Sequence, residues 1–156
     1  MMKPLHPIMV HFPIALLVVS IGADAVGLLA AVPSLSHTGW WTMLAAAGGA
    51  VVTAAAGVFD MRRATLSEDV HHRVHRHMKV GIVLVIAILG LAFWRWRMQL
   101  GGGPVSMYYI DAGVFAVVLA GVQGYLGGEL VYTDGVFVRR ASQSGDAKAD
   151  TSSHHH

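Results

Sequence analysis

Four long apolar runs dominate this chain, and they limit it to folds that a membrane can hold. The runs cover about residues 8–31, 40–60, 76–97 and 105–127. Each is long enough for a helix to cross about 30 Å of hydrocarbon. The apolar residues do not form the narrow stripe of an amphipathic soluble helix. The runs therefore predict an all-α integral membrane protein with four transmembrane helices.

The overall composition agrees with this interpretation. Hydrophobic residues make up 54% of the chain and charged residues 13%, and the mean hydropathy is +0.56. The net charge is +2, but the basic residues flank the apolar runs, so we do not expect nucleic acid as a partner. The chain has no cysteine, which excludes disulfides, thiolate metal sites, iron–sulfur clusters and covalent haem attachment.

Short links between the runs predict an up-down-up-down four-helix bundle over residues 1–138. We expect a loop at 33–39 and a long polar connection that leads into the third helix. The polar segment 139–156 is expected to be a disordered cytoplasmic tail, whose final His154–His156 look like the remnant of a tag.

Lysine and arginine predict the orientation in the membrane. Only Arg95 and Arg97 fall on the side away from the termini. The other nine are on the side that holds both termini: Lys3, Arg62, Arg63, Arg73, Arg76, Lys79, Arg139, Arg140 and Lys148. Because positive residues favour the cytoplasmic side, both termini are expected to be cytoplasmic, with the protein in the inner (plasma) membrane.

Polar residues from all four helices gather on this cytoplasmic side. They are His6, His11, Asp60, His71, His72, His75, His77, Glu129 and Tyr132. The opposite side offers a much sparser set: Asp24, His37, Arg95, Arg97 and Asp111. Since ionisable residues within a membrane are costly, the crowded layer is the candidate functional site.

Imidazoles from two helices of a bundle are suited to the axial ligation of haem b. His11, the deeper histidine of the first helix, is the preferred ligand, paired with His77 or His75. Three further residues of the same layer are candidate supporters: His6, Asp60 and Tyr132. This pattern favours a haem protein that takes part in electron transfer, with a cytochrome or another membrane redox protein as partner.

Two alternatives use the same sequence differently. The first is a non-haem or transport-associated protein that binds a divalent transition metal through His6, His11, His77, Asp60 and Glu129. The second is a cofactor-free structural or accessory subunit, in which the small residues of 45–57 pack against a partner or a second copy. In that case the basic segment 71–77 binds anionic lipid headgroups at the membrane surface.

An independent enzyme is not expected, because no nucleophile elbow, phosphate loop or paired-carboxylate motif is present. Asp24 lies deep within the first helix and needs a partner or a cavity. Arg95, Gln123 and Asp111 are its candidate partners, and an interhelical hydrogen bond is the expected role.

Three motifs resemble those of the bacterial "domain of unknown function 2231" family of four-helix membrane proteins. They are HPIMVHFPIAL at 6–16, GVFD at 57–60 and GGELVYTDGV at 127–136, and the resemblance covers about residues 4–138. It implies the four-helix fold. Relatives can be joined to cytochrome c-like domains, which implies haem and redox chemistry. The recurrent positions of the family correspond here to His6, His11, Asp60, His77, Gly127 and Gly128.

Overall fold

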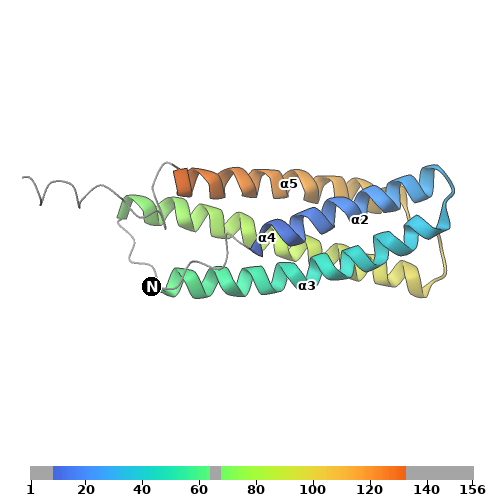
Figure 1. Ribbon diagram of the computed structural model, residues 1–156, viewed down its shortest axis with the longest axis horizontal. Helices are drawn as coiled ribbons and strands as arrows, with labels where there is room; N and C mark the ends of the chain where they lie inside the picture. Colours follow the sequence, from blue (N-terminus) through green and yellow to red (C-terminus); the bar gives the residue numbers. More distant parts are fainter. Residues whose placement is uncertain (1–8, 64–67, 133–156) are drawn as a thin grey trace, which may run out of the picture.

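The computed structural model describes the backbone of residues 9–63 and 68–132, and the side chains of 9–62 and 72–130. This part of the chain forms four helices and no strand (Figure 1): α2 (His11–Leu29), α3 (Pro33–Arg63), α4 (Glu68–Leu100) and α5 (Met107–Tyr132). Each helix is long and apolar enough to cross a membrane. The predicted all-α four-helix membrane fold is therefore confirmed. The predicted tail at 139–156 lies outside the described residues.

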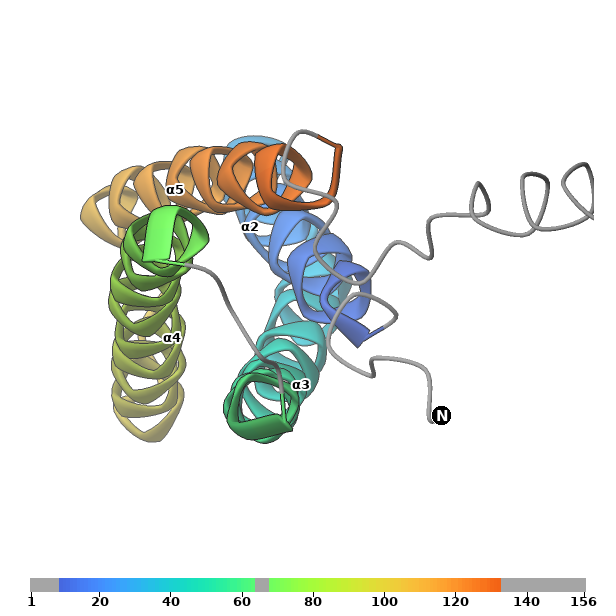
Figure 2. The same ribbon diagram turned by 90° about the vertical axis from the view of Figure 1, so that its left-hand side faces the viewer.

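Successive helices run in opposite directions, as short connections require. α2 packs against α3 and α5, and α4 also packs against α3 and α5. Viewed down the bundle axis, α2 and α4 therefore lie diagonally opposite each other (Figure 2). We call the end where α2 and α4 begin and α3 and α5 end the histidine end. The other end, where α2 leads into α3 and α4 into α5, is the opposite end.

The connection between α2 and α3 is shorter than the sequence predicts. The expected loop at 33–39 is wrong, because α3 already begins at Pro33. Proline suits the first turn of a helix, where its missing N–H is not needed. Ala31, with φ of 55°, turns the chain between the two helices. The first turns of α3 can therefore carry polar side chains back towards α2 and α4.

The core is built from all four helices, and small residues lie where two helices approach each other closely. Ala46 and Ala50 of α3 are buried, and a Cβ at Gly49 would lie 3.3 Å from Cβ of Pro13 on α2. Gly48, by contrast, has nothing within 4 Å of its Cβ position. The small residues of α3 thus serve close packing against α2 on one face, as small residues do in membrane bundles.

The outer surface of the bundle is apolar. Exposed side chains include Leu29 at 77%, Phe115 at 69% and Ile86 at 63%. A soluble domain would bury such residues, whereas a transmembrane bundle presents them to lipid tails. The structure thus has the surface of a protein in contact with the bilayer.

Candidate functional site

The histidine end holds the described members of the predicted polar layer. They are His11, Asp60, His72, His75, His77 and Glu129. His6 lies outside the described residues, and so do the side chains of His71 and Tyr132. The alternating helix directions are what bring residues from α2, α3, α4 and α5 to one end.

Of the described histidines, His77 is the one with the most buried side chain. Its imidazole is half-buried, and its Nε2 lies 3.1 Å from Nε2 of Gln123 on α5, within hydrogen-bond distance. Glycines make room for this pair, because a Cβ at Gly127 would lie 3.1 Å from Cε1 of His77. A Cβ at Gly81 would lie 2.9 Å from the Gln123 amide nitrogen. The pair therefore occupies a fitted position between α4 and α5.

The other described histidines of this end are exposed. His11 is the first residue of α2, and it makes no hydrogen bond or ion pair among the described residues. His72 and His75 face outward from α4. His11 and His77 belong to α2 and α4, which lie diagonally across the bundle.

The carboxylates of the layer are spread over two helices. Asp60 is half-buried near the end of α3, and Glu129 lines a small pocket with Arg73 and Arg76 of α4. Within the described residues, no group of three or more His, Cys, Asp or Glu side chains is arranged to hold a metal ion. The described side chains therefore form a dispersed polar layer, in which His77 and Gln123 make one close contact between α4 and α5.

A second polar site lies at the opposite end, buried in the bundle. Asp24 of α2 is fully buried, and Arg95 of α4 is only 1% exposed. Nε of Arg95 donates to Oδ2 of Asp24 over 3.1 Å, and Nη2 donates to Oδ1 over 3.2 Å. This two-pronged geometry is the strong form of the guanidinium–carboxylate pair, and it links two diagonal helices.

Arg95 also donates hydrogen bonds to α3 and to its own helix. Nη2 also donates to the carbonyl and the hydroxyl oxygens of Ser36, over 2.9 and 2.8 Å. Nη1 donates to Oε1 of Gln99 over 3.2 Å. The hydroxyl of Ser20 on α2 donates to the Gly39 carbonyl of α3 over 2.7 Å. Three helices are thus fastened together by one buried, hydrogen-bonded charge pair.

This second site shows which residue is the partner of Asp24, the carboxylate within the first apolar run. Of its three candidate partners, Arg95 is the correct one, and the predicted interhelical hydrogen bond is confirmed. Gln123 instead pairs with His77, and Asp111 is exposed. Sequence reasoning missed the role of Ser36, because the expected loop hid that it lies on the first turn of a helix.

Comparisons with known proteins give one informative result. No curated protein and no solved structure matches the chain. A family model described as "Predicted membrane protein (DUF2231)" matches residues 2–140, which include all four helices. The chain therefore belongs to the DUF2231 family of predicted membrane proteins.

Proposed function

We propose that this membrane protein binds haem b at the histidine end and takes part in electron transfer. The observation that carries the proposal is the position of His77. It presents an imidazole inside the bundle, partly shielded from solvent, where an axial ligand has to lie. When bound, haem b supplies an iron centre that gains and loses a single electron.

His77 suits a haem ligand in its burial and its location, but a side chain next to it must move before its Nε2 can bind iron. Its Nε2 lies against the Gln123 amide, so ligation through this nitrogen needs the amide to turn away. When the amide turns away it loses its contact with His77, but its Oε1, which is buried without a hydrogen-bond partner among the described residues, loses none. Before haem binds, Gln123 occupies the ligand position and holds the His77 imidazole in place.

The second ligand in this proposal is His11, with His75 as the alternative. His11 has the right chemistry, lies at the same end of the bundle and is not engaged by any described side chain. His6, Asp60 and Tyr132 remain the proposed supporting residues. The redox partner would be a cytochrome or another membrane redox protein.

A visible spectrum of the purified protein from haem-replete cells tests the proposal. We expect a Soret band that is lost or shifted in His77→Leu and in His11→Ala. His72→Leu is the matched control, since His72 is exposed on the same helix as His77 and should leave the band unchanged. A wild-type preparation with no Soret band would rule out the haem proposal.

We further propose that the histidine end faces the cytoplasm of a bacterial inner membrane. Among the described residues, the histidine end carries five lysines and arginines, which are Arg62, Arg63, Arg73, Arg76 and Lys79. The opposite end carries two, Arg95 and Arg97, and an excess of lysine and arginine is typical of the cytoplasmic side. The chain has no cysteine, so single cysteines can be introduced without background. An impermeant maleimide added to cells should label Thr38→Cys and not His72→Cys, and the reverse pattern would invert the topology.

A second candidate function is a cofactor-free structural or accessory subunit. It is favoured by the buried Asp24–Arg95 pair, which links α2 and α4 through side chains of the bundle itself. Under this proposal Gly48→Leu would disrupt assembly with a partner or a second copy, because Gly48 lies on the outer face of α3. His77→Leu would leave assembly intact.

Non-haem metal binding remains the third proposal, with less support from the described side chains, since they contain no cluster of three ligands. Elemental analysis of the purified protein separates it from the other two. Stoichiometric Zn, Cu or Ni without haem would favour it.

A further inference from the structure

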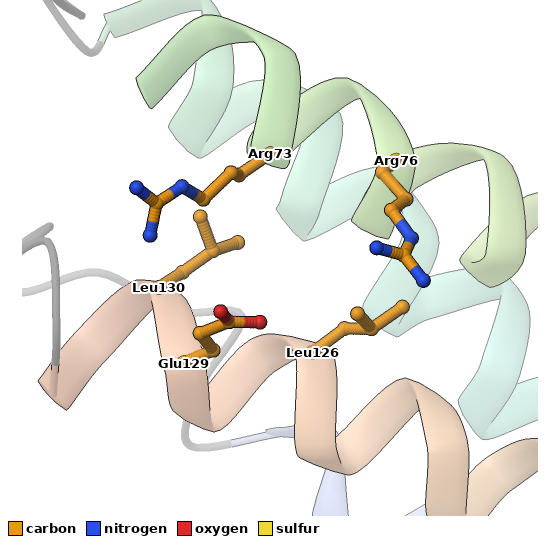
Figure 3. A pocket seen from close by; sticks show the side chains of 5 residues that line it. All are labelled: Arg73, Arg76, Leu126, Glu129 and Leu130. Carbon is orange, nitrogen blue, oxygen red and sulfur yellow. The ribbon is translucent and has the colours of Figure 1, made fainter. Parts of the chain in front are cut away.

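A small pocket lies between the start of α4 and the end of α5 (Figure 3). Its volume is about 180 Å³, and five residues line it: Arg73, Arg76, Leu126, Glu129 and Leu130. The two guanidinium groups come from α4, while the carboxylate and both leucines come from α5. In Figure 3 the carboxylate of Glu129 points into the space between the two arginines.

The charges of this pocket are arranged for a ligand that carries both signs. Arg73 and Arg76 are three residues apart, so they share one face of α4 and can approach the same anion. Guanidinium groups bind phosphate oxygens through paired N–H donors. The carboxylate of Glu129 would repel a purely anionic ligand but attract an ammonium group next to the phosphate.

The location of the pocket favours a lipid over a soluble ligand. The apolar run of α4 begins at about residue 76 and that of α5 ends at about residue 127, so the pocket lies at the membrane border. Next to it on α5, Tyr125 is 73% exposed, and aromatic rings of this kind are typical of the headgroup region. Val122, one turn further in, is also exposed and offers a path for an acyl chain.

We propose that this pocket binds a phospholipid whose headgroup carries a phosphate and a primary ammonium. The phosphate contacts the guanidinium groups of Arg73 and Arg76, the ammonium contacts the Glu129 carboxylate between them, and an acyl chain follows Leu126 and Leu130. The site is independent of haem, because none of these residues is a proposed axial ligand. It would hold one lipid at the junction of α4 and α5.

Native mass spectrometry of the detergent-purified protein tests this site with phosphatidylethanolamine and phosphatidylglycerol as probes. The wild type should bind phosphatidylethanolamine more tightly. The double change Arg73→Gln and Arg76→Gln should weaken that binding by about tenfold, the effect of losing charge-assisted bonds to phosphate. Glu129→Gln should reduce the preference between the two lipids by up to about fivefold, because Glu129 is only half-buried and solvent screens its charge.

Matched controls lie at the opposite end of the same helices. Arg97→Gln and Asp111→Asn remove the same charges from exposed positions and should change neither affinity. Equal wild-type affinity for the two lipids would overturn the proposal, and this result needs no variant to fold. Binding unchanged in the double variant would overturn it as well.

Soluble phosphoethanolamine, the headgroup without its acyl chains, tests whether the pocket requires a whole lipid. We expect it to bind far more weakly than the lipid, because it lacks the acyl chain that contacts the two leucines. Binding of equal strength would show that the pocket takes a soluble phosphate compound and would refute the lipid assignment. Each of these results is read from the mass of the lipid-bound protein and does not depend on whether haem is present.

Discussion

Replacing Arg95 by methionine should destabilise the bundle by about 3–5 kcal/mol, the usual cost of removing one partner from a buried ion pair. The structure supports this magnitude. Asp24 is fully buried and loses two charge-assisted bonds, each of which is worth roughly 1.5–3 kcal/mol. The carboxylate would then be buried without its countercharge, in a place that water does not reach.

Removing both charges should lower the free energy of unfolding much less than removing one of them. Leucine has the branched shape of aspartate, so Asp24→Leu combined with Arg95→Met replaces the pair by apolar groups of similar size. Such replacements are often neutral or stabilising. We expect the double variant to be more stable than Arg95→Met alone by about 2 kcal/mol or more, so that the two changes are strongly non-additive.

The measurement is unfolding in mixed detergent–SDS micelles, followed by circular dichroism, for the two single variants and the double variant. Arg97→Met is the matched control, because Arg97 is exposed on the same helix and its loss should cost less than about 0.5 kcal/mol. A cost below about 1 kcal/mol for Arg95→Met, or additive effects in the cycle, would refute the view that this pair fastens the bundle.

Two glycine substitutions test the close approaches between helices by the same unfolding assay. Gly39→Ala should destabilise the protein by about 1–3 kcal/mol, because the new Cβ would collide with the carboxylate that the ion pair holds in place. Gly48→Ala is its control on the same helix and should be neutral or slightly stabilising, as alanine is the better helix former. Gly81→Ala should cost about 1 kcal/mol by displacing the Gln123 amide, whereas Gly90→Ala, with open space around it, should not. Equal effects of the two members of either pair would contradict the packing described above.

The sequence alone was sufficient to predict the class of fold. Apolar runs of about twenty residues satisfy their own backbone only as helices in lipid, so their number and their order already define a four-helix membrane protein. The same order places His11, Asp60, His77 and Glu129 at one end, since antiparallel helices alternate in direction. This part of the prediction depends on hydrophobicity along the chain, which is a local property.

Which side chains meet was decided only by the tertiary structure. Asp24 had three candidate partners in the sequence, and the rotation and register of α2 and α4 select Arg95. The same packing leaves Gln123 for His77. Rotation and register depend on how small residues such as Gly39 and Gly49 let α3 approach α2. That fit is a property of two surfaces far apart in the chain, so no local pattern could reveal that one buried charge pair ties three helices together.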